Sequence, residues 1–186
     1  MGRIVMLAVL VFGLQSAFGG IKSERMLASI LRQTPEAILV ADGQQMKVAD
    51  AMAEQMTDVQ TFWGVGSSME PLYAPKTAII VKTIKYSELK KGMTVVYLNR
   101  RGLMVAHSLT GDLPDGWIAQ GINNDKEDDD LVTRHNLVGV IVQAYAAMHT
   151  DYRTALTKAL VAKGKSQPDG RPQLTFARSG LIGLIA

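Results

Sequence analysis

The sequence predicts a mainly β protein of the α+β class, in which short helices flank an antiparallel sheet. Three observations favour this class. From Thr61 onward, short runs of β-branched and other apolar residues alternate with turn-forming residues. Before that point, apolar residues recur at the spacing of helices. The length of 186 residues, 47% of them hydrophobic and 20% charged, suits one globular domain and excludes fibrous and wholly disordered chains.

Residues 1–20 carry the pattern of an export signal. Arg3 lies in a short basic region, an apolar run covers residues 4–14, and Ala17 and Gly19 are small residues placed for signal cleavage. The run is too short to span a bilayer, which takes about 20 apolar residues. A buried N-terminal helix and an uncleaved short anchor are the alternatives. We therefore expect an exported protein, periplasmic or extracellular, with membrane association left open.

Residues 21–58 are expected to form a helical N-terminal segment. Ser23 is placed to cap a first helix, and Pro35 marks its end. The apolar face of this helix consists of Met26, Leu27, Ile30 and Leu31. A second helix is expected over residues 45–56. Its apolar positions are typical of core packing rather than cofactor binding, and they are Val48, Met52 and Met56.

Residues 59–146 are expected to form the β domain. The predicted strands cover residues 77–82, 93–98, 102–109, 116–120 and 137–145. Residues 99–102 are expected to form a hairpin, and Pro114 and Asp115 lie in the next turn, over residues 111–116. Such short connections favour antiparallel pairing.

Residues 147–186 are expected to form a helix capped by Thr150 and then a loose basic tail. The chain has a net charge of +3, and its last 36 residues carry six Lys or Arg against two Asp. A basic tail without interleaved aromatic residues is typical of a solubilising segment, so no nucleic-acid partner is expected. The sequence has no cysteine, which excludes disulfides and thiolate sites. We expect neither a metal nor a cofactor.

A turn of small and polar residues lies where the helical segment gives way to the strands. Its residues Gly66, Ser67, Ser68, Met69 and Pro71 allow a serine side chain to stand clear of its backbone. The order Ser, Met, any residue, Pro resembles the nucleophile motif of the signal peptidase I and SOS-repressor serine peptidases. The resemblance implies a signal-peptidase-like antiparallel β catalytic domain with short flanking helices, in which Ser68 is the nucleophile.

The residues after this turn resemble the same family in order and in spacing. Leu89, Lys90 and Gly92 lie where the family has a Leu-Lys-x-Gly turn, and a Val-rich strand follows over residues 94–97. The next strand of the family carries the general base. That base is Lys in bacterial signal peptidases and SOS repressors, and His in the archaeal and endoplasmic reticulum branch. The resemblance therefore implies that His107 is the base.

The segment 121–130 resembles the family's Gly-Asp-Asn-Asn…Asp box, and Gly139 and Val140 fit the strand that closes the domain. The resemblance covers about residues 59–146. Three residues depart from the family's pattern: Ile122 replaces Asp, Ser108 replaces the Arg that commonly follows the base, and Met93 replaces the Asp that commonly follows Gly. Ile122 leaves the expected site with one carboxylate fewer.

Elementary chemistry favours the same pair of residues. A serine hydroxyl becomes a useful nucleophile when a base removes its proton, and an imidazole can do so near neutral pH. His107 is the best-placed candidate for this base, although a lone histidine on a strand is otherwise typical of a structural side chain. His135 and His149 fit surface or capping positions.

A catalytic imidazole also needs a carboxylate that orients it and stabilises its cation. Counting from Gly121, Asp128 falls at the position of the catalytic Asp in the histidine branch, whereas Asp129 suits the spacing of the other branch. Asp128 is the prediction and Asp129 its alternative. A solvated turn or a weak calcium loop would also explain the acidic run, although EF-hand spacing is absent. We expect Asp125 and Asp130 to be solvated.

The remaining residues of the turn are expected to complete the site. The N–H of Ser68 is the natural donor to an oxyanion, and the serine hydroxyl that some family members add falls at Gly66 here. Gly66, Met69 and Pro71 are the expected substrate-binding residues. Glu70 is not placed as a base and suits a surface or turn-stabilising role.

Together these observations predict an exported serine endopeptidase of signal-peptidase-like type, which cleaves an extended peptide by acyl transfer. Its expected partner is a peptide or protein substrate. One alternative is a catalytically decayed peptide-binding or structural protein of the same fold, which Ile122 and Ser108 favour. The other is a self-cleaving repressor-type peptidase. The export signal, the lack of room for a helix-turn-helix domain and the absence of Ala-Gly and Cys-Gly dipeptides argue against it.

Overall fold

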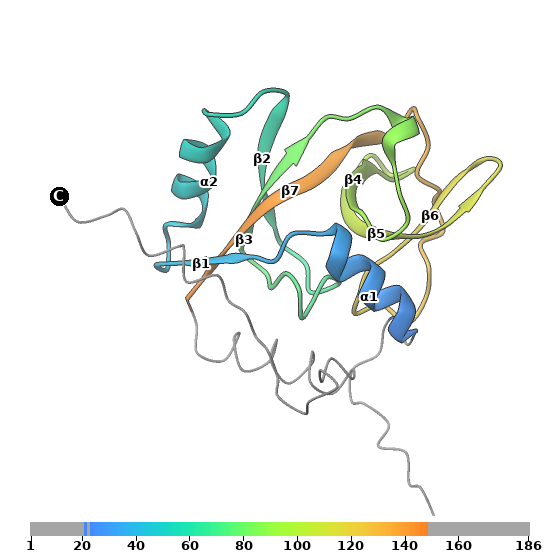
Figure 1. Cartoon of the computed structure of the whole chain (residues 1–186), viewed down its shortest axis with the longest axis horizontal. Helices are drawn as coiled ribbons and strands as arrows, with labels where there is room; N and C mark the ends of the chain where they lie inside the picture. Colours follow the sequence, from blue (N-terminus) through green and yellow to red (C-terminus); the bar gives the residue numbers. More distant parts are fainter. Residues whose placement is uncertain (1–20, 22, 149–186) are drawn as a thin grey trace, which may run out of the picture.

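Seven strands form one mainly antiparallel sheet, with short helices packed beside it (Figure 1). The computed structural model describes residues 21 and 23–148. The strands are β1 Ile38–Val40, β2 Val59–Gly64, β3 Thr77–Lys82, β4 Thr94–Leu98, β5 Met104–Leu113, β6 Gly116–Gln120 and β7 Leu137–Ala147. Their order in the sheet is β2-β3-β7-β4-β5-β6, and β1 pairs with β7 in parallel. The predicted mainly β, antiparallel class is confirmed.

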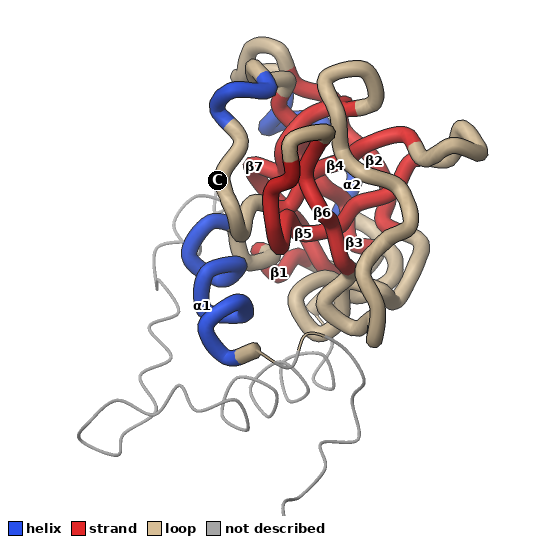
Figure 2. The backbone as a smooth tube through the Cα atoms, turned by 90° about the vertical axis from the view of Figure 1, so that its right-hand side faces the viewer, coloured by secondary structure: helices blue, strands red, loops and turns tan. Residues whose placement is uncertain are grey.

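The first helix, α1 (Glu24–Gln33), begins and ends where the sequence predicts. The hydroxyl oxygen of Ser23 accepts a hydrogen bond from the N–H of Met26, and the helix ends at Thr34 because Pro35 cannot continue it. Met26, Leu27 and Ile30 are buried. Figure 2 shows α1 along one side of the strands, and its nearest strand is β5.

The second helix, α2 (Gln45–Ala53), is shorter than predicted. Residues 54–56 continue as turns, in which the N–H of Met56 bonds to the carbonyl of Ala53. Val48, Met52 and Met56 pack against Ala78, Ile80 and Tyr145 of the sheet. The Met-containing face is therefore a core face, as the sequence predicts.

Five of the seven strands differ from the prediction, and one of them, β4, begins at Thr94 rather than at residue 93. β1 and β2 are absent from the predicted set, and β7 runs two residues further than expected. β5 begins at Met104 rather than residue 102 and runs to Leu113. It pairs with β6 up to the Leu113–Gly116 pair, so the connecting turn contains Pro114 and Asp115 rather than all of residues 111–116.

The predicted export signal over residues 1–20 and the predicted helix and basic tail after Thr150 lie outside the described residues. Within residues 21 and 23–148, none of the helices has the length and apolar character needed to cross a bilayer.

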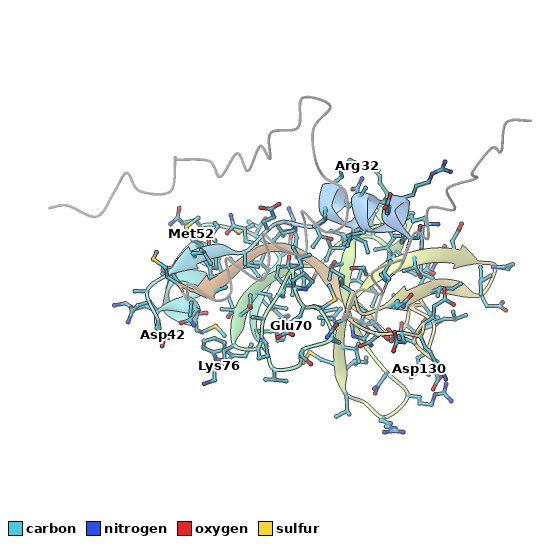
Figure 3. All side chains as sticks on the ribbon, turned by 90° about the horizontal axis from the view of Figure 1, so that it is seen from below. Arg32, Asp42, Met52, Glu70, Lys76 and Asp130 are labelled. Carbon is cyan, nitrogen blue, oxygen red and sulfur yellow. The ribbon has the colours of Figure 1, made fainter. Side chains whose placement is uncertain are left out.

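Two of the three hydrophobic clusters lie beneath the predicted site. The first joins α1 to Met69, Leu72 and Ile122, and the second surrounds Tyr97 and Leu109 of β4 and β5. The third lies under α2. Figure 3 shows Met52 of α2 and Asp130 toward opposite ends of the molecule, so α2 supports the sheet at a distance from the acidic segment.

A chain of buried hydroxyls ties α1 to the strand that carries His107. The hydroxyl oxygens of Ser108 and Thr94 lie 2.8 Å apart, and those of Thr94 and Thr34 also lie 2.8 Å apart. Thr34 donates its hydrogen to the carbonyl of Gly92. Since that hydrogen is committed, Thr94 donates to Thr34 and Ser108 donates to Thr94. Ser108 is 0% exposed, which leaves no space for the Arg that commonly follows the base in the resembling family.

Candidate active site

The nucleophile turn, residues 66–72, lies in the connection between β2 and β3, and its buried side chains anchor it on the hydrophobic core. Met69 is 5% exposed and lies with Leu72 in the first hydrophobic cluster. The carbonyl of Met69 accepts backbone hydrogen bonds from Leu72 and Tyr73, and the carbonyl of Ser67 accepts one from Glu70. These bonds hold the tight turn on the core. They leave Ser67 exposed and Ser68 half-buried at the surface.

His107 approaches Ser68 from β5, next to the β6 end of the sheet. It lies on β5, opposite Val95 of β4, and is 7% exposed. Its Nε2 is 2.8 Å from the Oγ of Ser68. Because pairing on β4 fixes the backbone, the ring has a defined direction toward the nucleophile turn.

Asp128 approaches the other ring nitrogen of His107. Its Oδ2 is 2.6 Å from Nδ1 of His107, and its backbone N–H bonds to the carbonyl of Ala119 on β6 at 2.8 Å. The hydroxyl of Tyr97 donates to the same Oδ2 at 2.7 Å. Ser68, His107 and Asp128 thus form a continuous hydrogen-bonded line. A carboxylate in this position favours the imidazole tautomer whose Nε2 accepts a proton.

Asp129, the alternative to Asp128, lies apart from the imidazole. Its carbonyl accepts a hydrogen bond from the guanidinium of Arg100, which also pairs with the carboxylate of Asp130. The backbone N–H and then the side chain of Arg100 hold the pKa of Asp130 below its usual range. Asp130 therefore forms an ion pair with Arg100 at the exposed surface, away from the Ser68–His107–Asp128 line.

The start of the acidic loop, residues 121–130, is hydrogen-bonded to the nucleophile turn. The backbone N–H of Asn123 donates to the carbonyl of Ser68 at 2.8 Å, and its side-chain Nδ2 donates to the carbonyl of Ser67 at 3.3 Å. Gly121 is so close that a β-carbon there would lie 2.8 Å from the Ser68 carbonyl oxygen. Sequence reasoning missed this role, although the Gly-x-Asn-Asn run that carries it was visible.

Ile122 lies between Gly121 and Asn123 in the chain, and its side chain is buried in the core. It is 2% exposed and belongs to the first hydrophobic cluster with Met69. A carboxylate among those apolar side chains would lose its hydration. The apolar residue therefore suits its surroundings, even though it departs from the family's pattern.

The three expected substrate-binding residues lie in different environments. Gly66 is exposed and Pro71 is half-buried, so both have surface that a peptide could contact. The Met69 side chain packs in the core instead, because the turn needs an apolar anchor there. Met69 thus supports the turn from beneath.

A polar cleft of about 730 Å³ opens beside the imidazole, between the β4–β5 hairpin and the acidic loop. His107 and Asp128 lie on its wall together with Arg101, Asn123 and Lys126. Within the described part of the chain, no cluster of three or more His, Asp or Glu side chains is arranged to hold a metal ion. The cleft thus opens beside the His107–Asp128 pair, and Ser68 lies at the other ring nitrogen of His107.

No protein-family model matches this sequence, and no curated protein matches it significantly.

Proposed function

We propose that the protein is a serine endopeptidase of signal-peptidase-like type, with Ser68 as nucleophile, His107 as general base and Asp128 as the residue that orients it. The observation that carries the proposal is the hydrogen-bonded line from Asp128 through His107 to Ser68. These side chains come from a loop, a strand and a turn that are distant in sequence. Their convergence at 2.6 and 2.8 Å has the donor order that acyl transfer needs.

In the first step, Ser68 Oγ attacks the carbonyl carbon of the scissile peptide bond while its proton passes to Nε2 of His107. Asp128 stabilises the imidazolium that results. The tetrahedral intermediate then collapses, and the imidazolium gives its proton to the leaving amine, which departs as a free N-terminus. Water attacks the remaining acyl-enzyme by the reverse proton route, and Ser68 is regenerated.

The oxyanion of the intermediate would be stabilised by the N–H of Ser68. In a trans peptide unit, N–H and C=O point in opposite directions. The side chain of Asn123 donates to the Ser67 carbonyl, so the N–H of Ser68 in the same peptide unit points away from Asn123. Among the described residues, no backbone oxygen accepts this N–H.

Two open strand edges support binding of an extended peptide. β2 pairs with β3 alone, and β5 pairs with β6 only from Ser108 onward. By the alternation of antiparallel bonding, the N–H and C=O groups of Met104 and Ala106 point away from β4. A substrate strand that pairs with such an edge would pass beside His107 and Ser68.

We place this activity outside the cytoplasm. The support is the charge and apolar pattern of residues 1–20, which resembles an export signal. Membrane association of the exported chain is compatible with a short uncleaved anchor.

Covalent labelling with a fluorophosphonate probe tests the proposal without knowledge of the natural substrate. The wild-type chain should be labelled at Ser68, as mapped by peptide mass spectrometry, and Ser68→Ala should abolish both labelling and peptide hydrolysis. Ser67→Ala is the matched control, because it removes a neighbouring exposed hydroxyl, and it should retain most of the reaction.

Two results would contradict the proposal. Labelling that depends on Ser67 would mean that the register of the motif is wrong. A folded wild-type chain that binds peptides but is never labelled would favour the decayed binding protein instead. Ile122 and Ser108, the residues that favour that alternative, both fill buried positions.

A further inference from the structure

Tyr97 makes a second hydrogen bond to the carboxylate that faces the imidazole. Its hydroxyl donates to Oδ2 of Asp128 at 2.7 Å, and the same oxygen lies 2.6 Å from Nδ1 of His107. The tyrosine ring is 1% exposed and packs with Val95 and Leu109 in the second hydrophobic cluster. One carboxylate oxygen therefore has hydrogen-bonding partners on two neighbouring strands.

We propose that Tyr97 is a positioning residue, which acts through Asp128 to set both the orientation and the basicity of His107. This inference rests on the proposed function, because it concerns the same nucleophile and base. Sequence reasoning gave Tyr97 no role beyond its place in a Val-rich strand.

The direction of the Tyr97 hydrogen bond is fixed by charge. A phenol has one hydrogen, and a carboxylate oxygen can only accept it. Burial, and after it the hydrogen bond to Asp128, raise the pKa of Tyr97 above its usual value. The phenol therefore stays protonated, and it donates to Asp128 at every pH at which the site could work.

This bond has two consequences for the imidazole. Together with the bond from the Asp128 N–H to the Ala119 carbonyl, it holds the carboxylate in one orientation. It also disperses the negative charge on Oδ2, which weakens the stabilisation that Asp128 gives to an imidazolium. Tyr97 thus limits how strongly Asp128 can stabilise a positive charge on the ring of His107.

Other charged groups also surround this pair. Arg100 is paired with Asp130, and the further charged residues that line the cleft are Arg101, Asp125, Lys126, Glu127 and Asp129. Tyr97→Phe replaces none of these residues, so the wild type and the variant carry the same charged groups around the site. The difference between the two reports on the hydroxyl.

The test compares Tyr97→Phe with the wild type, using the rate of Ser68 labelling by a fluorophosphonate as a function of pH. We expect the plateau rate to fall by about tenfold, which is about 1.4 kcal/mol in the barrier. We also expect the pH of half-maximal rate to rise, because the carboxylate regains charge. Asp128→Asn should move that pH in the opposite direction, and Tyr97→Phe should cause no further shift in the Asp128→Asn background.

Tyr86→Phe is the matched control. Tyr86 packs against the same cluster, and its hydroxyl donates to the carbonyl of Val132 rather than to Asp128. This variant also loses one phenol hydrogen bond, but its rate and its pH of half-maximal rate should match the wild type.

A positioning role for Tyr97 would be overturned by an unchanged rate and pH profile, by a lower rate without the upward shift, or by an equal shift in Asp128→Asn.

If Tyr97→Phe fails to fold, 3-fluorotyrosine at this position keeps the ring and donates more strongly. It should lower the pH of half-maximal rate, and no change would overturn the proposal. If the wild type resists labelling, the proposed function fails separately. The titration of the His107 ring, followed by NMR in wild type and variant, then decides the role of Tyr97.

Discussion

Gly121 lies against the backbone of Ser68, so that a β-carbon at Gly121 would stand 2.8 Å from the Ser68 carbonyl oxygen. The same β-carbon would stand 2.9 Å from the side chain of Asn124. A backbone oxygen cannot move away as the end of a flexible side chain can. The packing of the acidic loop on the nucleophile turn therefore depends on a residue without a side chain at this position.

Gly121→Ala should consequently displace Ser68 from His107. We expect the labelling rate to fall by at least about tenfold, or about 1.4 kcal/mol in the barrier, and stability to fall by about 1–3 kcal/mol from overpacking. Labelling kinetics and urea unfolding measure the two effects. Gly43→Ala is the control, since Gly43 has φ of 78° and open space around it. It should lose some stability through backbone strain and keep its rate, whereas equal rate losses in both variants would contradict the prediction.

Asp128→Asn should remove the carboxylate that orients the imidazole of His107 and stabilises its positive charge. The labelling rate should fall by more than about tenfold, or about 1.4 kcal/mol in the barrier. The pH of half-maximal rate should move down, because loss of the negative charge favours the neutral ring. The measurement is the rate as a function of pH. Asp129→Asn is the matched control, because its carbonyl rather than its carboxylate contacts Arg100. If neither variant lost tenfold, the site would be a dyad of Ser68 and His107.

Ser108→Ala should destabilise the fold by breaking the buried hydroxyl chain. The change removes the hydrogen that Ser108 donates to Thr94 and leaves a buried acceptor without it, a loss of about 1–3 kcal/mol. Urea unfolding measures this effect. Ser87→Ala removes an exposed hydroxyl near Glu88 and should leave stability almost unchanged. An equally small effect at Ser108 would mean that the chain of hydroxyls contributes little.

Asp130→Asn should lower stability near neutral pH and have no effect in strong acid. Hydrogen bonds from Arg100 depress the pKa of Asp130 in the folded state, so its contribution is present above the pKa of the unfolded chain. That contribution is lost as pH falls through the lower, folded-state pKa. Melting temperatures at both pH values, with and without high salt, test this, because salt screens an exposed pair. Asp115→Asn, in the exposed β5–β6 turn, should show no such pH-dependent difference.

Expressed in a bacterium, the full chain should cross the cytoplasmic membrane. The reason is the basic, apolar and small-residue order of residues 1–20. Cell fractionation with N-terminal sequencing provides the measurement, and a cleaved signal should give a mature N-terminus near Gly20. A chain that begins at Ile21 is the control and should stay in the cytoplasm. Recovery of the full-length protein from the cytosol would contradict the prediction.

Local sequence carries enough information for the strongest elements of this fold. The prediction of β3 matches its observed bounds because Thr77 and the β-branched run from Ile79 to Val81 follow Pro75 and Lys76. β1 has only three residues and depends on parallel pairing with the distant β7. β2, Val59–Gly64, mixes polar and apolar residues and ends in glycine, so its pattern is weak. Strands of this kind are determined by their partners more than by their own residues.

The residues of the candidate site also differ in how far local sequence could predict them. The prediction of Ser68, His107 and Asp128 rested on the resemblance of their motifs to those of serine peptidases, and the structure places the three within hydrogen-bonding distance in one line. Tyr97 and Asn123 were not, since a tyrosine in an apolar strand and an asparagine in a loop have many uses. Their roles follow from contacts across 31 and 56 residues of chain, which no local pattern contains.

β7 is the bridge between the two parts of the sheet that hold the candidate site. β2 and β3 flank the nucleophile turn, while β4, β5 and β6 carry His107 and anchor Asp128, and in the sheet β7 lies between β3 and β4. It is also the last strand of the described chain. Ser68 and His107 are therefore both synthesised before the strand that aligns their neighbours, and such non-local pairing is slow to form. Among the described strands, β7 is thus both the last to be synthesised and the one that joins the two parts of the sheet.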